Sequence, residues 1–247
     1  MTDNRAGVHI TPFGSFGHVR DWVFDLDNTL YPAECDLFAE IDTRMTDFVS
    51  RLLMLPPAEA RKIQKQYYAE YGTTLAGLMT VHKIDPSDFL GHVHKIDLSP
   101  LPDLPNLRSA LERLPGRKFV YTNGSRGHAE QVTDKMGLSH LFNGSFGIED
   151  SDYVPKPKPA SYAAFLKLHD VDPHGAIFFE DLARNLAPAK DVGFTTVLVH
   201  SEKDWSHEPI EARPASLSDV LGDDGPDHID YVTGDLAAFL EAAIETL

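Results

Sequence analysis

The stretch DWVFDLDNTLY at residues 21–31 decides how the rest of the chain is interpreted. It begins as a short apolar strand and delivers two carboxylates, Asp25 and Asp27, two positions apart. Acidic side chains this close together, and partly out of water, repel each other unless a cation lies between them. Mg²⁺ is a hard ion that prefers oxygen ligands. The stretch therefore predicts a buried strand with a magnesium site at its carboxyl end.

Further β-rich stretches follow along the chain, each leading into helix-like sequence. They are residues 119–122, 145–148, 176–180 and 195–199. Strands that alternate with helices indicate a parallel sheet covered by helices. Apolar side chains in residues 236–244 recur at helical spacing and predict a closing helix packed on the core. The predicted fold class is therefore α/β.

Nearly a hundred residues separate the strand end at Asp25 from the next strand end at Thr122. A simple strand–helix–strand unit takes only about 30 residues, so something is inserted. Within residues 33–100 the apolar side chains keep helical phase and no convincing strand is found. We expect an all-helical cap over residues 33–100, a core over residues 20–32 and 101–247, and a loose leader over residues 1–19.

Polar side chains follow the other predicted strands, which is where ligands bind in an open parallel sheet. Thr122 and Asn123 precede a glycine turn into a helix N-terminus, which offers backbone N–H groups to an anion. Alternating prolines hold Lys156 on a stiff loop, where its ammonium can meet a phosphate. Glu180 and Asp181 add two carboxylates at another strand end. We expect these groups to converge on one mouth.

Composition and charge exclude several classes of protein. The chain has 38 acidic and 22 basic side chains and a net charge of −16, whereas nucleic-acid-binding domains carry clustered Lys and Arg. No apolar run approaches the roughly 18 residues of a membrane helix, and residues 1–20 lack the apolar centre of a signal peptide. The single cysteine, Cys35, cannot form an internal disulfide. We expect a cytoplasmic protein that binds a small phosphorylated metabolite, with neither nucleic acid nor membrane as a partner; its oligomeric state is left open.

These motifs, in this order, resemble those of the haloacid dehalogenase superfamily. The matching residues are DLDNTL at 25–30, Thr122-Asn123, KPKP at 156–159, and Glu180-Asp181 with Asn185. The resemblance implies a Rossmann-like parallel sheet flanked by helices, with the inserted helical cap of the type 1 branch. More narrowly, DLDNTLYP at 25–32, YYAEYGTTLAGL at 67–78 and HKIDP at 82–86 resemble the pyrimidine 5′-nucleotidase group.

The resemblance implies a catalytic or binding role for each residue at the mouth. Asp25 would attack phosphorus and form an aspartyl-phosphate. Asp27 would protonate the leaving oxygen and later take a proton from the attacking water. Thr122, the Asn123 N–H and Lys156 would hold the oxygens of the transferred group.

The resemblance also implies a set of ligands for Mg²⁺. The ion would be held by the Asp25 carboxylate, the Asp27 backbone carbonyl and the Asp181 carboxylate. Glu180 would be a supporting ligand or would lie just outside the ligands of the ion. Asn185 stands where many relatives carry a second acid, and an amide there can orient a ligand but adds no charge.

Three alternatives concern single residues. Lys158 competes with Lys156, because the two differ only by the register of the loop. His92 and His94 are spaced like a metal pair, but residues two apart on a helix point to different faces, so we expect solvent-exposed histidines. Tyr67, Tyr68 and Tyr71 are candidates to stack on a nucleobase, and Tyr71 is the one we assign to substrate binding, although the helical phase of Tyr67 and Tyr71 also fits the core.

The predicted function is Mg²⁺-dependent hydrolysis of a phosphomonoester, with a pyrimidine nucleoside 5′-monophosphate such as UMP or CMP as the substrate. Phosphoglycolate or a sugar phosphate is the alternative substrate, because such phosphatases share the mouth and differ in the cap. The haloacid dehalogenases lack the second acid, so Asp27 argues against that reaction. A non-catalytic metabolite-binding or regulatory protein is disfavoured by the intact Asp25, Asp27 and Lys156.

Overall fold

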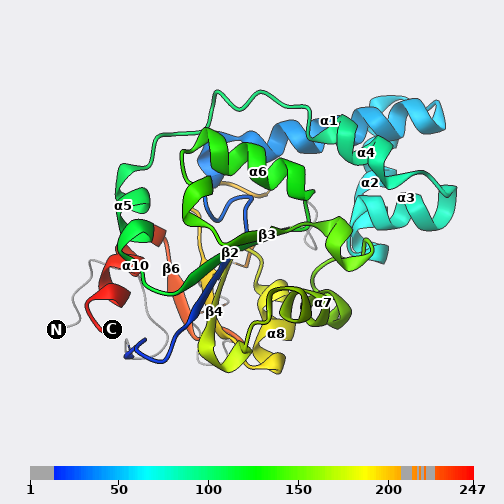
Figure 1. Ribbon diagram of the computed structural model, residues 1–247. Coiled ribbons are helices and arrows are strands. Elements are labelled where there is room, and N and C mark those ends of the chain that lie inside the picture. The colour runs from blue at the N-terminus through cyan, green and yellow to red at the C-terminus, as the bar shows by residue number, and fades with distance from the viewer. Residues whose placement is uncertain (1–13, 207–212, 216, 218–219, 221–225) are drawn as a thin grey trace.

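The protein is built on one sheet of six parallel strands in the order β3-β2-β1-β4-β5-β6 (Figure 1). The computed structural model describes residues 14–206, 213–215, 217, 220 and 226–247. The strands are β1 (Asp21–Phe24), β2 (Arg117–Tyr121), β3 (Gly144–Phe146), β4 (Ala176–Glu180), β5 (Thr195–Val199) and β6 (Tyr231–Thr233). The α/β class with a parallel sheet is thus confirmed.

Strand β1 lies at the centre of the sheet and determines where a ligand can bind. Its last residue, Phe24, is in register with Val120 of β2 on one side and with Phe179 of β4 on the other. The strands that follow β1 in sequence, β2 and β3, lie on one side of it, and the later strands β4 to β6 lie on the other side. This reversal of strand order opens a crevice beyond the carboxyl ends of the central strands. The loops after β1, β2 and β4 therefore meet at one edge.

Helices cover both faces of the sheet, because successive side chains of a buried strand point to opposite sides. Trp22 and Phe24 pack under α5 (Pro105–Arg113), α6 (Arg126–Lys135) and α10 (Leu236–Ile244). Val23, between them, faces the other side, under α7 (Pro159–His169) and α8 (Ala183–Val192). Short 3₁₀ turns complete the core: η2 (Ser139–Leu141), η3 (Ile148–Ser151) and η4 (Pro173–Gly175).

The insertion after β1 is helical and has its own apolar cluster. After the turn η1 (Ala33–Cys35) it forms α1 (Leu37–Leu53), α2 (Pro57–Tyr71), α3 (Thr74–His82) and α4 (Pro86–Val93). Residues 33–100 are all described, and none of them lies in a strand. Their apolar cluster includes Ile41, Leu78 and Phe89, together with Ile148 from the core. Figure 1 shows the four helices beside the sheet, beyond the end of β1.

Glycine sets the spacing between two helices of the insertion. A Cβ on Gly77 of α3 would lie 2.4 Å from Cβ of Tyr67 in α2, closer than side-chain atoms approach. The missing side chain therefore lets α3 pack directly against the ring of Tyr67. At the end of α2, Gly72 takes a φ of 91°, which ends the helix in a left-handed residue.

The sequence located β4 and β5 correctly and missed β6, whose three residues are too short to show a period. The expectation of a loose leader is wrong for Phe16 and Val19, which are 1% and 4% exposed. Phe16 packs against Trp22, Tyr231 and Phe239, so the core begins before residue 20. Residues 1–13 of that leader lie outside the described part of the chain.

Among the described residues, every helix is too short or too polar to cross a bilayer.

Candidate active site

The two acids of the first motif are presented by a tight turn at the end of β1. The Asp25 backbone N–H donates to the Phe179 carbonyl at 2.9 Å, which keeps Asp25 in line with the sheet. The chain then curls, with Leu30 N–H donating to the Leu26 carbonyl at 3.0 Å. Asn28 allows the turn by adopting a φ of 62°, a left-handed conformation that asparagine tolerates well. The turn leaves Asp25 and Asp27 both lining one cavity.

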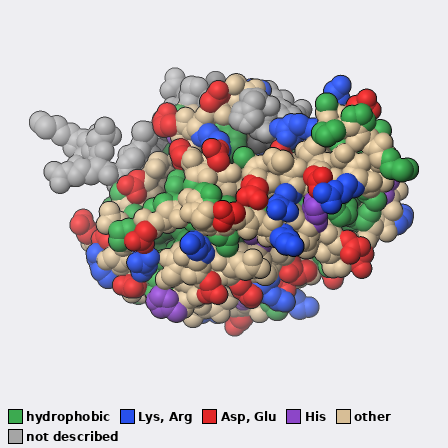
Figure 2. Space-filling model, turned by 90° about the horizontal axis from the view of Figure 1, so that it is seen from above, with side chains coloured by type: hydrophobic (Ala, Val, Ile, Leu, Met, Phe, Trp, Pro, Cys, Tyr) green, Lys and Arg blue, Asp and Glu red, His purple; other side chains and the backbone are tan. Residues whose placement is uncertain are grey.

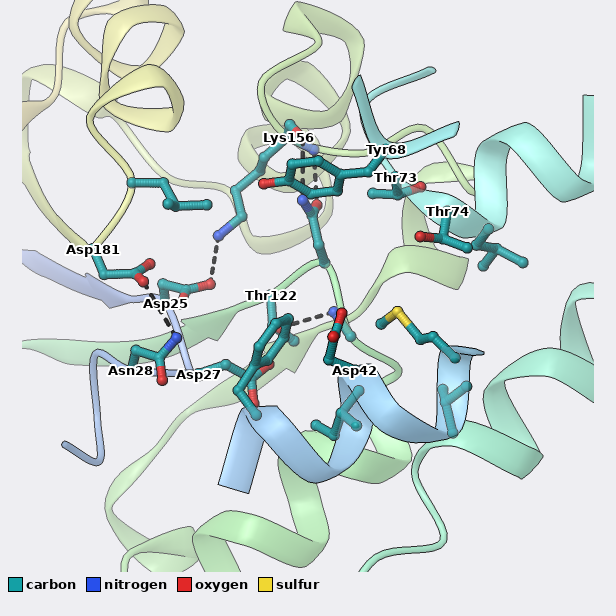
Figure 3. A pocket seen from close by; sticks show the side chains of 18 of the residues that line it. Asp25, Asp27, Asn28, Asp42, Tyr68, Thr73, Thr74, Thr122, Lys156 and Asp181 are labelled. Carbon is teal, nitrogen blue, oxygen red and sulfur yellow. Dashed lines mark hydrogen bonds and ion pairs between the residues drawn. The ribbon is translucent and has the colours of Figure 1, made fainter. Parts of the chain in front are cut away.

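Lys156 lies at the centre of the site. Its ammonium donates to Asp25 Oδ1 at 2.6 Å, to the Tyr121 carbonyl at 2.9 Å and to Glu180 Oε1 at 3.0 Å. Figure 3 shows the side chain reaching down to Asp25. The residue is 1% exposed, whereas Lys158 is exposed at the surface. The loop register therefore brings Lys156, and not Lys158, into the mouth.

Asn123 fixes the loop that carries Lys156. Its side-chain Oδ1 accepts from the Lys156 backbone N–H at 2.8 Å, and its Nδ2 donates to the Lys156 carbonyl at 3.1 Å. The neighbouring Thr122 is 2% exposed, and its hydroxyl accepts from the Gly124 N–H at 2.9 Å. Both residues line the cavity. The loops after β2 and β3 are thereby held together at the mouth.

Three buried carboxylates surround the ammonium group of Lys156. Asp25, Glu180 and Asp181 place an oxygen each within 4.8 Å of one another. Burial raises the pKa of Asp25 to about 7, with Lys156 lowering it and Glu180 and Asp27 raising it. Burial and the charges of Glu180 and Asp25 raise the pKa of Asp181 well above its usual value. The cluster thus holds three carboxyl groups against one ammonium group in a site with little solvent, and Asp25 and Asp181 tend to keep their protons when no cation is bound.

The donor set fits a hard divalent cation. Glu180, the last residue of β4, and Asp181, which follows it, differ in how many hydrogen bonds their carboxylate oxygens accept. Glu180 Oε1 accepts from Lys156 and Asn185, and its Oε2 accepts from Leu182 N–H at 2.6 Å. Although burial opposes it, the charge of Lys156 and these hydrogen bonds lower the pKa of Glu180. Asp181 receives a longer hydrogen bond, 3.4 Å, from Asn28. Its carboxylate is therefore the more available for a metal ion.

Asp27 is held by two side chains that the sequence analysis did not single out. Its Oδ1 accepts from the Tyr31 hydroxyl and lies 3.1 Å from His128 Nε2. Burial opposes ionisation of Asp27, but the charge and hydrogen bond of His128, together with Tyr31, lower its pKa overall. Tyr31 belongs to the first motif, and His128 lies in the first turn of α6 behind its N-cap, Ser125. The position of His128 in the first helical turn after a strand end was the signal in the sequence that could have identified it.

The carboxylates and Lys156 open into a cavity of about 360 Å³ between the sheet edge and the inserted helices. On the helical side, Asp42 of α1 accepts from Lys65 Nζ at 2.7 Å and from Gln64 Nε2 at 2.6 Å, and pairs with Arg61. Figure 3 shows Asp42 across the cavity from Asp25. The cavity therefore has one end lined by acidic side chains and Lys156, and a second wall of polar and aromatic side chains.

Two of the aromatic rings that line this cavity have a cationic neighbour. The Arg184 guanidinium of α8 lies 4.5 Å from the ring centroid of Tyr68 in α2 and donates to its hydroxyl. The Lys203 ammonium lies 5.0 Å from the ring centroid of Trp205. Lys203 also donates to the Ala33 carbonyl at 2.9 Å. The sequence left open the role of residues 201–230. Within this stretch, Lys203 and Trp205 line the cavity, and Pro209 lies outside the described residues.

The predicted base-stacking residue does not reach the cavity. Tyr71 is absent from its lining, and its ring packs edge-on against Tyr67 at 5.8 Å. Tyr68 lines it instead, one position after Tyr67. Tyr71 lies four positions after Tyr67 and shares its face of the helix, whereas Tyr68 is the next residue and is turned by about 100° around the helix axis.

The expectation of solvent-exposed histidines at positions 92 and 94 is wrong. His92 is 23% exposed and lies 3.0 Å from Asp47. His94 stacks on His128, with ring centroids 4.4 Å apart and an angle of 8° between the planes. The two histidines do point in different directions, so they form no metal pair. His94 is instead partly buried where the inserted segment returns to the core.

Charge on the outer surface differs from charge in the cavity. Figure 2 shows acidic and basic side chains interspersed over the face seen from above, with neither sign gathered into a field. A surface that grips a polyanion gathers its basic side chains. The charged side chains that gather at one place in this protein are those that line the cavity, and the volume of about 360 Å³ suits a small molecule.

Comparison with known proteins agrees with this geometry. A family model described as haloacid dehalogenase-like hydrolase matches residues 22–193. Phosphate metabolism protein 8 of Saccharomyces cerevisiae is 28% identical over 203 residues, which cover 75% of this chain. The chain spans 62% of the length of that yeast protein.

Solved structures share the fold at low sequence identity. An L-2-haloacid dehalogenase from Xanthobacter autotrophicus, with chloropropionic acid covalently bound, has a TM-score of 0.53 and 19% identity. The similarity covers 90% of this chain and 97% of that one. A HAD phosphatase from Thermococcus onnurineus also has a TM-score of 0.53, with 20% identity, covering 75% of this chain and 88% of that one.

Proposed function

The chain belongs to the haloacid dehalogenase-like hydrolases, and from this premise we propose that it is a Mg²⁺-dependent phosphomonoester hydrolase acting through an aspartyl-phosphate intermediate. The observation that carries the proposal is the set of contacts around Lys156. This buried ammonium, three carboxylates and the Thr122 hydroxyl meet at the closed end of one cavity. Such a site suits a phosphoryl group that must be held by cations while a carboxylate attacks it.

The proposed reaction uses two carboxylates in sequence. A carboxylate oxygen of Asp25 attacks phosphorus, the bond from phosphorus to the leaving oxygen breaks, and Asp27 gives that oxygen a proton. Water then attacks the phosphorus of the aspartyl-phosphate while Asp27 takes back a proton, and the bond to Asp25 breaks. Lys156, the Thr122 hydroxyl and the Asn123 N–H hold the other phosphoryl oxygens.

Mg²⁺ is proposed at the carboxylate cluster. The Asp25 and Asp181 carboxylates and the Asp27 backbone carbonyl would hold it, and Glu180 would support Lys156 and the loop after β4. When bound, the ion neutralises negative charge on the phosphoryl group and the acids.

A pyrimidine nucleoside 5′-monophosphate is the proposed substrate, and residues 33–100 are the proposed cap. The cap motifs support this choice, and so do the size and lining of the cavity. About 360 Å³ is within the range of cavities that bind drug-sized molecules, and Tyr68 and Trp205 offer rings against which a base can stack. The name of the yeast relative, phosphate metabolism protein 8, is consistent with a phosphate ester as substrate.

A substrate panel tests the proposal. Phosphate release is measured from UMP, CMP, purine nucleoside monophosphates, phosphoglycolate and sugar phosphates, each with Mg²⁺ and with a chelator. We expect the highest kcat/KM for UMP or CMP, no turnover in the chelator, and a loss in kcat of at least about 10³-fold in Asp25→Asn.

The exposed Asp134 of α6 supplies the matched control, because Asp134→Asn makes the same chemical change outside the cavity and should leave turnover unchanged. Full turnover in Asp25→Asn would refute the covalent mechanism. A preference for phosphoglycolate or a sugar phosphate would favour the alternative substrate class. Chloride release from a 2-haloacid would contradict the proposed reaction. Binding of the compounds without turnover would indicate a non-catalytic protein.

A further inference from the structure

The proton-carrying residue of the proposed reaction, Asp27, has one of its two oxygens fully engaged. Its Oδ1 receives the Tyr31 hydroxyl and lies 3.1 Å from His128 Nε2. An ionised carboxylate can only accept hydrogen bonds, so both neighbours act as donors. Burial and the charge of Asp27 raise the pKa of Tyr31 well above its usual value, so this hydroxyl keeps its proton.

The engagement of Oδ1 determines where a proton can be added. In the described part of the chain, the structure shows hydrogen bonds to Oδ1 of Asp27 and none to Oδ2. With two donors on Oδ1, the lone pairs of that oxygen are occupied. A proton that Asp27 gains therefore resides on Oδ2.

His128 is itself held in one orientation by its surroundings. Its side chain is 1% exposed, and its backbone N–H donates to Ser125 Oγ, the N-cap of α6, at 3.1 Å. The ring of His94 stacks flat on the His128 ring at 4.4 Å. His94 is fixed in turn, because its Nδ1 forms a hydrogen bond of 2.9 Å with Ser125 Oγ. His94 follows α4, so the contact joins the inserted helices to the core.

We propose that His128 is a positioning residue for Asp27, holding Oδ1 through Nε2–H so that the transferred proton travels on Oδ2, and that His94 keeps the His128 ring in place. The proposal rests on the proposed function, in which Asp27 is the acid and then the base. Asp27 first takes up a proton on Oδ2 from the phosphomonoester monoanion, and in the first step this proton moves to the leaving oxygen as the Asp25–phosphorus bond forms and the bond from phosphorus to the leaving oxygen breaks. In the second step a proton of the attacking water moves to Oδ2, so Asp27 again carries a proton there, as it did on entering the first step.

Leaving-group dependence distinguishes positioning from general damage. An alkyl phosphate such as UMP leaves as a strongly basic alkoxide and needs the acid, whereas p-nitrophenyl phosphate releases a weak base and does not. In His128→Phe, which keeps a flat ring against His94, we expect kcat/KM to fall about 10²-fold for UMP. For p-nitrophenyl phosphate we expect a change of less than about 3-fold, because general acid catalysis adds little there.

Two further variants complete the series. His128→Gln keeps an N–H donor and should recover kcat/KM for UMP to within about 10-fold of the wild type, because the amide N–H can donate to the same carboxylate oxygen. His169→Phe is the matched control: this histidine, partly buried among Phe119 and Phe165, lies outside the cavity and should leave both substrates unaffected. Equal losses on the two phosphates, or no loss in His128→Phe, would overturn the proposal.

A spectroscopic measurement tests the contact between His128 and Asp27 without any turnover. Its result does not depend on the substrate, so a wrong nucleotide assignment can be distinguished from a wrong role for His128. Ring ¹⁵N NMR of histidine-labelled protein should show the Nε2–H signal of His128, and Asp27→Ala should shift it. An unchanged signal in Asp27→Ala would mean that His128 does not hold Asp27, whatever the substrate. If the panel identifies another alkyl phosphate, that compound replaces UMP in the comparison and the same outcomes apply.

Discussion

Single residues at the mouth combine burial with charge, and Lys156 is the extreme case. Burial alone would lower its pKa, but the charges of Asp25 and Glu180 raise it above the ordinary value. The rings of Tyr121 and Phe178 lie 4.9 and 5.2 Å from the ammonium and add attraction from their π faces. A buried ion pair contributes little compared with an apolar replacement, but a single charge left without its partner is costly.

Lys156→Met is therefore expected to reduce the free energy of unfolding by about 3–5 kcal/mol at pH 8, because Asp25 and Glu180 stay buried without a counter-charge. Urea unfolding monitored by circular dichroism in the presence of a chelator measures the loss. Lys158→Met removes an equal charge from the exposed neighbour and should change stability by less than about 0.5 kcal/mol. Similar losses in both variants would contradict this account of the ion cluster.

The residues that the sequence could identify are those that follow strands directly. Asp25, Lys156 and Asp181 stand at strand ends or on a loop between prolines, so local pattern was enough to expect them in one mouth. His128 was missed because its role depends on where α6 begins relative to the turn after β1, which is a tertiary fact. Tyr68 was one of three candidate tyrosines on the same helical segment, and the assignment went to Tyr71 because only packing decides which ring faces the cavity.

Helix α2 connects the inserted segment to the site. Its N-terminal half supplies Arg61 and Lys65 to Asp42 of α1, and its C-terminal half carries Tyr68 to Arg184 of α8. These contacts join both walls of the cavity through one element. The sequence predicted helical phase here and in the rest of residues 33–100, because long amphipathic segments repeat their signal several times.

Tyr68→Ala is expected to lower kcat/KM for the preferred nucleotide by about 10-fold or more, since stacking on one base contributes about 1–3 kcal/mol. Steady-state kinetics with that nucleotide and with methyl phosphate, which has no base, measure the effect. The loss should be confined to the nucleotide. Tyr71→Ala, on the same helix but outside the cavity, provides the control; an equal loss in that variant would remove Tyr68 from the binding site.

At the scale of the whole molecule, the order of strands explains why distant segments share one site. The acids after β1, the hydroxyl after β2 and the acids after β4 are far apart in sequence but adjacent at the sheet edge. The sequence predicted a parallel sheet from its alternating elements and the insertion from its length. It could not predict β6 or the packing of Phe16, because both depend on partners supplied by the finished core.

The charge balance of this site predicts that Mg²⁺ stabilises the fold more at pH 8 than at pH 6. The pKa of Asp25 is about 7 in the folded protein, above its ordinary value of 3.8, so folded Asp25 retains a proton that the unfolded chain releases. Its contribution to metal-free stability is thus present at low pH and is lost as the pH rises through about 7. A bound cation offsets that loss where the carboxylates are ionised.

Thermal unfolding with Mg²⁺ and with a chelator at the two pH values measures this difference. An excess of Mg²⁺ about 100 times its Kd should add about 2.7 kcal/mol at pH 8, and less at pH 6, where protons compete for the same oxygens. Asp181→Asn should reduce the Mg²⁺ effect at pH 8. A shift of equal size at pH 6 and pH 8 in the wild type would show that the ion binds away from these acids.

The two tryptophans of the chain occupy contrasting surroundings. Trp22 is fully buried in the core, with its indole N–H donating to the Pro115 carbonyl at 2.8 Å. Trp205 stands in the cavity wall beside Lys203. The tryptophan fluorescence of the protein therefore has a part from Trp22 that stays constant and a part from Trp205 that changes when a ligand occupies the cavity. Ligand binding can thus be followed by intrinsic fluorescence.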